Sequence, residues 1–230
     1  MPCMSLPGLD VLVSLIEAEV GRALSATDLD AGSGEDRSVL ESLPSALRGL
    51  VPSERPVPTS HPALGRWLDP AVESAPEQQR PLAAAVRALA PHLTWKSAYP
   101  DAPSSPTMRR FWANYAFAPV ATPEGGVGGV GPLLSAEMSL YLVVQGAGIE
   151  YGRHHHPATE VYGIVSGTAR WLRGDHGFRS RAPGDVFVHQ PDVVHATTTG
   201  VEPAISWAAW LGDLESRPLL ETSNGSFVKV

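Results

Sequence analysis

The chain has 230 residues and a formal net charge of −7, so it can bury one substantial core and carries a mild excess of acidic groups. This balance argues against nucleic acid as a partner, because phosphate binding needs clustered lysine and arginine. Cys3 is the only cysteine, which excludes a disulfide framework and thiolate chemistry at a metal. No stretch has the pattern of a membrane span or a secretory leader, so we expect no membrane partner and a cytoplasmic location.

Residues 1–104 are predicted to form a helical extension that packs on the rest of the chain. Apolar side chains recur at helical spacing from Leu9 to Leu24, which places one apolar stripe against a partner surface. The segment Ser38-Val-Leu-Glu41 is typical of a capping box and predicts a second helix that begins near Val39. Such helices suit packing and dimerisation, so a homodimer is an expected assembly.

The rest of this extension contains a proline-rich connector and a further helix. Prolines dominate from Val51 to Pro62, which favours an extended segment over a helix. Ser74-Ala-Pro-Glu77 matches a capping box, and the alanine-rich run from Pro81 to Ala90 predicts a third helix.

From about Met108 the sequence changes to short β-rich segments separated by glycine and proline. The predicted strands are 139–144, 160–165, 169–173, 186–189 and 204–211. Such a series is typical of a barrel or a jelly roll, and it defines a second predicted unit at residues 105–230. The glycine-rich stretch 124–131 lacks a phosphate-binding pattern, so we interpret it as a flexible loop and a candidate lid at the barrel mouth.

The most informative pattern is a group of histidines and a glutamate in this second unit. His154, His156 and Glu160 fit the spacing G-x5-H-x-H-x3-E-x6-G, and His195 follows four residues after a turn at Pro191. Because alternate side chains of a strand share a face, His154 and His156 point the same way. Imidazole nitrogens with one carboxylate suit one divalent transition metal, with Fe²⁺, Zn²⁺, Mn²⁺, Co²⁺ and Ni²⁺ as candidates.

This spacing resembles the first cupin motif, which implies a mainly β fold: a cupin (jelly-roll) barrel with an N-terminal helical extension. Over about residues 105–215 the chain also resembles the cupin-type dimethylsulfoniopropionate (DMSP) lyases. In that family the metal ligands are two histidines, a glutamate and a tyrosine, in the order H-x3-E-x-Y followed by a distant histidine. Here that order is met by His156, Glu160, Tyr162 and His195.

The resemblance implies a carbon–sulfur lyase that cleaves DMSP by β-elimination to acrylate and dimethyl sulfide. A divalent cation would hold the substrate carboxylate while a tyrosine acts as general base. Tyr162 is the leading candidate for the base. Tyr151 is its rival, because it occupies the place of a second active-site tyrosine ahead of the histidines. His154 fits the first cupin ligand position, but the lyase pattern uses Tyr162 instead, so we expect His154 near the metal and in contact with substrate.

Further substrate contacts are expected from a late strand and its neighbours. Trp207 and Trp210 are three positions apart, so only one of them faces the cavity, where its indole would hold the sulfonium by cation–π attraction. Tyr141 is another expected contact. Two other functions fit the same ligands, a cupin Fe(II) dioxygenase and a non-catalytic cupin that binds a small molecule.

Overall fold

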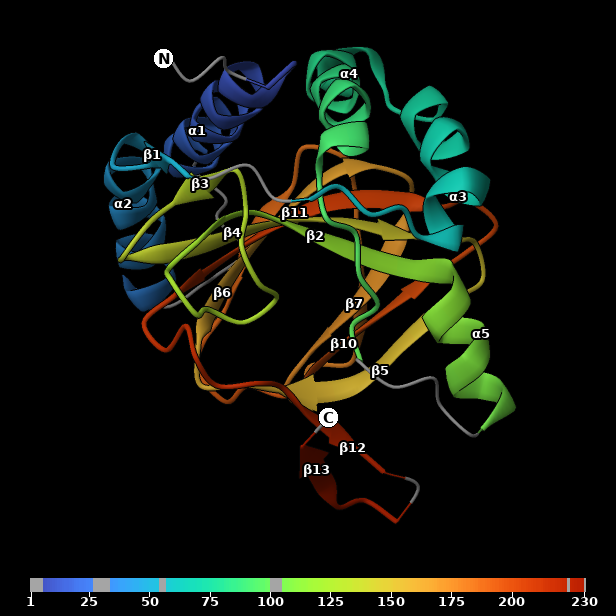
Figure 1. The fold of residues 1–230 in the computed structure, drawn as a ribbon. Helices are drawn as coiled ribbons and strands as arrows, with labels where there is room; N and C mark the ends of the chain where they lie inside the picture. Colours follow the sequence, from blue (N-terminus) through green and yellow to red (C-terminus); the bar gives the residue numbers. More distant parts are fainter. Residues whose placement is uncertain (1–5, 27–33, 54–56, 100–104, 223, 230) are drawn as a thin grey trace.

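The computed structural model describes residues 6–26, 34–53, 57–99, 105–222 and 224–229, in which helices precede most of the strands (Figure 1). The helices are α1 (Leu9–Ser25), α2 (Gly34–Arg48), α3 (Pro62–Glu73), α4 (Arg80–Leu89) and α5 (Pro106–Asn114), with short 3₁₀ turns η1 (Glu77–Gln79) and η2 (Ala90–His92) on either side of α4.

The strands form a seven-stranded and a six-stranded sheet. The larger sheet contains, in spatial order, β1 (Val51–Pro52), β3 (Leu133–Leu134), β2 (Tyr115–Thr122), β4 (Met138–Gln145), β11 (Ala204–Leu211), β6 (Thr159–Ser166) and β9 (Val186–His189). The smaller sheet contains β13 (Phe227–Lys229), β12 (Leu219–Glu221), β5 (Glu150–His155), β10 (His195–Thr199), β7 (Ala169–Arg173) and β8 (Phe178–Arg181). Among the described strands, only the β2–β3 pair is parallel.

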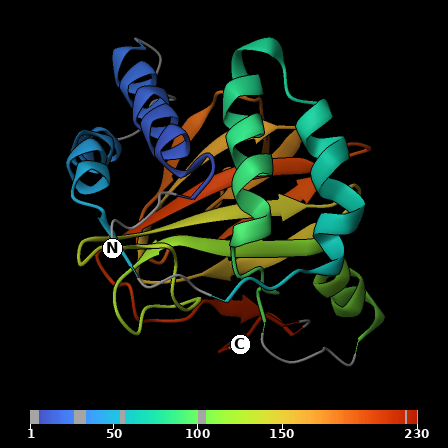
Figure 2. The same cartoon turned by 45° about the horizontal axis from the view of Figure 1, so that its top comes forward.

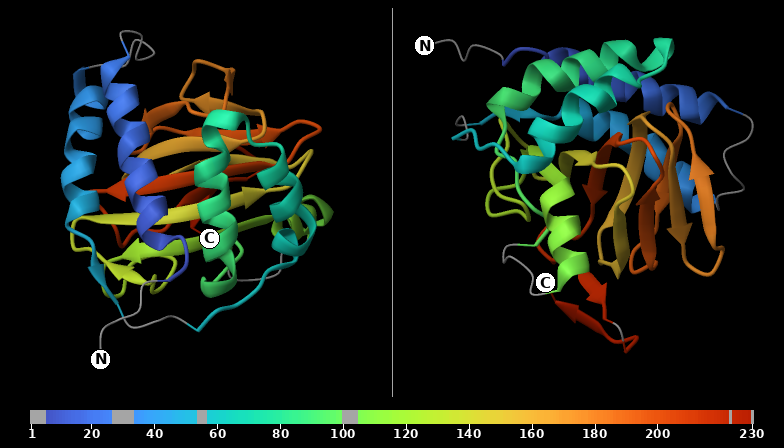
Figure 3. Two further views of the ribbon diagram at one scale, coloured as in Figure 1. Left: turned by 90° about the horizontal axis from the view of Figure 1, so that it is seen from above. Right: turned by 90° about the vertical axis from the view of Figure 1, so that its right-hand side faces the viewer.

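The molecule has three layers, because helices cover the outer face of the larger sheet while the smaller sheet closes its inner face (Figures 1 and 2). Seen from above, α1, α2, α3 and α4 lie across the strands of the larger sheet (Figure 3, left). The side chains between helices and sheet form the main apolar core, which includes Leu12, Ile16, Leu140 and Trp207. The inner faces of the two sheets enclose a second, aromatic-rich space that contains Tyr162 and other rings.

Strand β11 shows how alternation divides these two spaces. Trp207 and Ala209 face the helices, whereas Ala208 and Trp210 face the smaller sheet. The indole of Trp207 lies over Gly163, its partner on β6, where an added Cβ would come within 2.1 Å of the ring. Gly163 therefore lets the Trp207 ring pack flat on the sheet beneath the helices.

The predicted first helix is confirmed, and the predicted third helix from Pro81 to Ala90 corresponds to α4, but both predicted capping boxes are wrong. Helix α2 begins at Gly34, so Ser38 and Glu41 lie inside the helix and do not form a capping box. Its first turn instead carries Glu35 and Asp36, whose negative charges suit a helix N-terminus. Ser74 caps the end of α3, where its hydroxyl donates to the carbonyl of Ala71.

Two helices were not predicted. Helix α3 begins at Pro62, and the ring of His61 caps it by accepting a hydrogen bond from the Ala63 amide at 3.2 Å. Helix α5 occupies residues that were expected to be β-rich, and Ser105 caps it through a 3.1 Å bond from the Met108 amide.

The predicted strands match the structure closely. Strands β7, β9 and β11 have the predicted ends, and β4 and β6 extend the predicted segments by one residue at each end. The predicted connector 51–62 contains β1 and an isolated bridge at Thr59, while its residues 54–56 lie outside the described ranges. None of the described helices is long and apolar enough to cross a membrane.

Candidate metal centre

Three buried side chains form a group that could hold a metal ion. One ligand atom from each of His156, Glu160 and His195 lies within 4.8 Å of the others. The Nε2 atoms of His156 and His195 lie 3.3 Å and 3.2 Å from Oε2 of Glu160. Glu160 extends from the larger sheet, whereas His195 lies on the smaller sheet, so this carboxylate bridges the two inner faces.

Hydrogen bonds to the backbone fix the orientation of three imidazole rings. Nδ1 of His154, His156 and His195 lies 2.8, 3.0 and 2.8 Å from the carbonyl oxygens of Gly152, Ala158 and Val193. A carbonyl only accepts, so each Nδ1 carries the proton and donates it. Nε2 is then the nitrogen with which each ring could bind a divalent metal.

The charge state of the group also fits a cation. Burial alone would raise the pKa of Glu160, but the hydrogen bonds and charges of His156 and His195 outweigh it and hold that pKa well below its ordinary value. Burial lowers the pKa of His154 well below its usual range, so this ring is neutral. A carboxylate and neutral imidazoles are the donors that transition metals such as Fe²⁺ and Zn²⁺ accept.

His154 lies beside this group but outside it. The β10–β5 register pairs it with His195, and the two ring centroids are 4.1 Å apart. One face of His154 stacks on Tyr151, with 3.9 Å between centroids and 12° between planes. His155 has the opposite orientation, as its position in the strand predicts, and its Nδ1 lies 3.1 Å from Oδ1 of Asp192.

The two candidate tyrosines line one cavity with His156 and Glu160. Tyr162 follows Glu160 by two residues on β6, and its ring lies 4.5 Å from that of Trp171. Burial, and after it the charge of Glu160, raises the pKa of Tyr162 well above 10. Burial likewise raises the pKa of Tyr151, which packs among Phe111 and other rings. Both side chains are therefore phenols in the described structure.

The two tryptophans occupy opposite faces of β11, as their spacing predicts. Trp210 lines the cavity, stacks on His156 at 4.2 Å, and donates from Nε1 to Oε1 of Glu160 at 2.7 Å. Trp207 does not reach the cavity: its Nε1 donates to Glu19 of α1 at 2.7 Å. The expected substrate contact through Trp207 is therefore wrong, because Trp207 lies on the face of β11 that packs against the helices.

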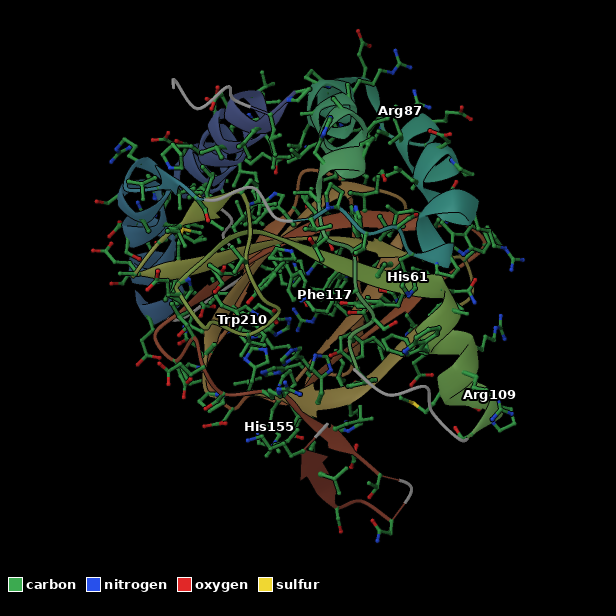
Figure 4. The ribbon with its side chains drawn as sticks, in the orientation of Figure 1. His61, Arg87, Arg109, Phe117, His155 and Trp210 are labelled. Carbon is green, nitrogen blue, oxygen red and sulfur yellow. The ribbon has the colours of Figure 1, made fainter. Side chains whose placement is uncertain are left out.

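Aromatic rings form most of the cavity wall. All five tyrosines of the chain are buried, and four of them line the cavity: Tyr115, Tyr141, Tyr151 and Tyr162. Phe117 and Trp210 add two further rings, and Figure 4 places both in the interior of the barrel. None of the described residues that line it is lysine or arginine. Tyr115 was missed in the sequence, since it follows an unpredicted helix and belongs to no motif.

The glycine-rich stretch lines this cavity and a neighbouring one. Val127 lines the cavity itself, and residues 125–129 line a wider outer cavity with Lys96 and Arg217. The hydroxyl of Tyr141 donates to the Val127 carbonyl at 2.7 Å, and Lys96 Nζ donates to Gly128 at 2.7 Å. The hydroxyl of the expected substrate contact Tyr141 is therefore engaged by the loop, while its ring faces the cavity.

Comparison with known proteins shows the family to which the chain belongs. A family model described as dimethylsulfoniopropionate lyase matches residues 35–206, which is more than half of the chain. The chain belongs to the DMSP lyase family. The family resemblance inferred from the histidine, glutamate and tyrosine spacing is thus confirmed. A curated DMSP lyase, DddQ of Ruegeria pomeroyi, is 38% identical over 99 residues, which are 43% of this chain and 49% of that protein. The chain therefore spans about half the length of the curated relative that it matches.

Solved structures of DMSP lyases share the fold. The crystal structure of DMSP lyase DddQ from Ruegeria pomeroyi DSS-3 has a TM-score of 0.72 and 26% identity, and the match covers 96% of this chain and all of that one. A chain from the structures of the DMSP lyases RdDddP and RnDddQII has a TM-score of 0.69 at 23% identity, with 93% of this chain covered. The predicted mainly β cupin barrel with an N-terminal helical region is confirmed.

Proposed function

We propose that this protein is a metal-dependent carbon–sulfur lyase that cleaves DMSP to acrylate and dimethyl sulfide. The observation that carries the proposal is the composition of one cavity, where His156 and Glu160 of the buried His-Glu-His group lie among aromatic walls with no described lysine or arginine. DMSP has a carboxylate at one end and a sulfonium at the other. The cavity offers a different partner to each end.

The sulfonium end suits the aromatic wall. Ring faces attract a cation, and Phe117 and Tyr115 present rings to the cavity while excluding water. Trp210 positions two of the proposed ligands, because its Nε1 donates a hydrogen bond to Glu160 and its ring stacks on His156.

The carboxylate end has no cationic side chain among the described residues of the cavity, so it suits a bound divalent ion. His156, Glu160 and His195 would hold this ion, with Tyr162 proposed as a fourth ligand. When bound, the ion supplies positive charge that fixes the substrate carboxylate and stabilises negative charge on the adjacent carbon. The fixed orientation of the two imidazole rings and the ionised Glu160 fit this role.

We propose Tyr162 as the general base, with Tyr151 as the alternative. Burial and the negative charge of Glu160 keep the phenol of Tyr162 protonated. A divalent ion held by Glu160 would neutralise that charge and so remove one cause of the high pKa of Tyr162. The phenolate takes the proton from the carbon next to the carboxylate. The electron pair then forms the double bond of acrylate, the C–S bond breaks, and dimethyl sulfide leaves as a neutral molecule. The proton passes from Tyr162 to solvent.

Headspace detection of dimethyl sulfide tests this function directly. We expect the purified protein loaded with Fe²⁺, Zn²⁺, Mn²⁺, Co²⁺ or Ni²⁺ to release dimethyl sulfide and acrylate in equal amounts from DMSP, without uptake of O₂. Treatment with a chelator should abolish the release, and addition of the metal should restore it. Oxygen consumption that depends on DMSP, or a metal-loaded protein that leaves DMSP intact, would contradict the proposal.

The sequence also predicts a homodimer and a cytoplasmic location, and both stay predictions. Light scattering on the purified protein tests the first.

A further inference from the structure

One small residue lies among the aromatic side chains of the cavity that contains His156 and Glu160. Ala208 of β11 is 2% exposed and lines this cavity, which is about 70 Å³ in volume. The strand register pairs Ala208 with Tyr141 of β4 on one side and with Tyr162 of β6 on the other. Because directly opposite residues of antiparallel strands share a face of the sheet, all three side chains point into the cavity.

The small size of Ala208 leaves a slot between two tyrosine rings. Neighbouring strands of a sheet lie about 4.8 Å apart, so Tyr141 and Tyr162 start from positions about 10 Å apart with a single methyl group between them. The row continues on the far side of Tyr162 with Phe187 of β9, which is again aromatic. The wall formed by these four residues is therefore recessed at Ala208.

A third ring closes one end of this slot. Trp210 follows Ala208 by two residues on the same face of β11, and its ring centroid lies 5.8 Å from that of Tyr141. The polar groups of both rings are engaged, because Tyr141 donates to the Val127 carbonyl and Trp210 donates to Glu160. The slot therefore suits the alkyl groups of a cation, which ring faces attract, better than it suits a carboxylate.

The walls of the slot have little freedom to move apart. Tyr162 packs on Trp171 with 4.5 Å between ring centroids, and Trp210 stacks on His156 at 4.2 Å. A closely packed wall yields little when a ligand is too large, so a single added or missing methylene group changes discrimination by roughly 10–200-fold. The room above Ala208 should therefore decide which substituents a bound cation can carry.

We propose that Ala208 is a specificity-determining residue, which limits the size of the alkyl groups on the sulfonium of the substrate. The proposal rests on the proposed function, because that function assigns the sulfonium end of DMSP to the aromatic part of the cavity. A sulfonium with two methyl groups fits the slot, whereas larger groups overlap the rings of Tyr141 and Tyr162. Glycine at position 208 deepens the slot, and valine fills it.

Two substrates that differ only in their sulfur substituents test the slot. For DMSP and its diethyl analogue, the ratio of kcat/KM values measures the room at position 208. We expect Ala208→Gly to shift this ratio roughly tenfold towards the diethyl analogue, and Ala208→Val to lower kcat/KM for DMSP by a similar factor, mainly through KM. Ala209→Gly is the matched control, because it makes the same change on the face of β11 that packs against the helices. Its ratio should equal that of the unaltered protein.

Binding without turnover separates this proposal from the proposed function. Trimethylammoniopropionate and its triethyl counterpart carry the same carboxylate and a cation but contain no sulfur, so they cannot release a thioether. Calorimetry on the Zn²⁺-loaded protein should show a preference for the trimethyl compound, and Ala208→Gly should reduce this preference roughly tenfold. A protein that behaves in this way but releases no dimethyl sulfide from DMSP refutes the proposed function alone.

The role of Ala208 is overturned if the Ala208→Gly, Ala209→Gly and unaltered proteins discriminate equally between the two ammonium compounds, whether or not DMSP is cleaved. An unaltered protein without any preference for the trimethyl compound overturns it as well. Should Ala208→Val fail to fold by circular dichroism, the glycine variants decide, because they add no atoms to the packed interior.

Discussion

Strand β11 carries two tryptophan–glutamate pairs that differ in almost everything except their hydrogen bond. On the helix side, Trp207 donates to Glu19 at 2.7 Å, and on the cavity side Trp210 donates to Glu160 at 2.7 Å. Both carboxylates are nearly fully buried. The same donor thus meets the same acceptor on the two faces of one strand.

The neighbouring residues shift the pKa values of these two carboxylates in opposite directions. Glu19 also accepts a 2.6 Å bond from the neutral amide of Gln79, and burial raises its pKa despite these bonds. Glu160 lies between His156 and His195, and their hydrogen bonds and charges lower its pKa well below the usual value. A buried carboxylate is therefore a structural group on one face and a candidate metal ligand on the other, and the adjacent imidazoles make the difference.

Removing Glu160 should have the largest effect on activity. Ala at this position deletes the oxygen that lies between the two Nε2 atoms, so we expect loss of stoichiometric metal and of DMSP cleavage. Glu150→Ala, an exposed change on β5, should keep both. Metal analysis with the headspace assay distinguishes them. Full metal content in both Glu160→Ala and His195→Ala would contradict the ligand assignment.

Removing the Tyr162 hydroxyl should have the next largest effect. Phe keeps the ring that packs on Trp171 but cannot take a proton, so acrylate release should fall by roughly a hundred-fold or more. Retained metal with lost activity would identify base chemistry, whereas joint loss would identify a ligand. Tyr151→Phe, measured in parallel, decides between the two tyrosines. The tyrosine mechanism fails if both single variants and the double variant stay fully active.

Comparing His154 with His156 should show a smaller difference. His156 belongs to the close group of ligand atoms, and His154 lies beside it, so metal affinity should fall further in His156→Ala than in His154→Ala. Titration of each metal-free variant with Zn²⁺ measures both affinities. The reverse order would restore the usual cupin ligand set, with His154 in the place given to Tyr162.

Changing Glu19 should leave activity intact and alter stability. Glu19→Ala leaves the Trp207 and Gln79 donors buried without an acceptor, so the free energy of unfolding should fall by about 2–4 kcal/mol. Because the folded-state pKa of Glu19 is raised, its protonation stabilises the folded protein at low pH. This stabilisation is lost as the pH rises through that pKa. This part of the pH dependence should vanish in the variant.

Denaturant melts between pH 4 and pH 8 measure both effects. Glu17→Ala is the control on the same helix, because its partner Arg48 is exposed and such surface pairs contribute about 0–1 kcal/mol. A Glu19→Ala protein that loses its metal would contradict the separation of the two faces.

The sequence predicted the barrel strands better than the helices. Alternation and flanking turns are local signals, and they placed β7, β9 and β11 at their observed ends. Helix α2 was misplaced because Ser38 and Glu41 resemble a cap that the fold does not use. Helix α3 was missed because its N-cap is His61, a residue that standard capping patterns do not include.

The close group of His156, Glu160 and His195 could be predicted from motif spacing, but its surroundings could not. His156 and Glu160 lie near each other in sequence, so alternation predicted that they face the same side. The contact between Trp207 and Glu19 joins residues 188 positions apart, and no local pattern encodes it. For the same reason the placement of Tyr115 and the stacking of His189 on His195 needed the fold.

The Nδ1 bonds to Gly152, Ala158 and Val193 have a consequence for how quickly and how tightly the protein would take up its metal. Rotation of three imidazole rings is already restricted in the metal-free chain, so little side-chain freedom is left to lose when an ion arrives. Uptake should therefore proceed in one kinetic phase, with no slower rearrangement after it. The ring resonances of these histidines should be sharp in NMR spectra even before any metal is added.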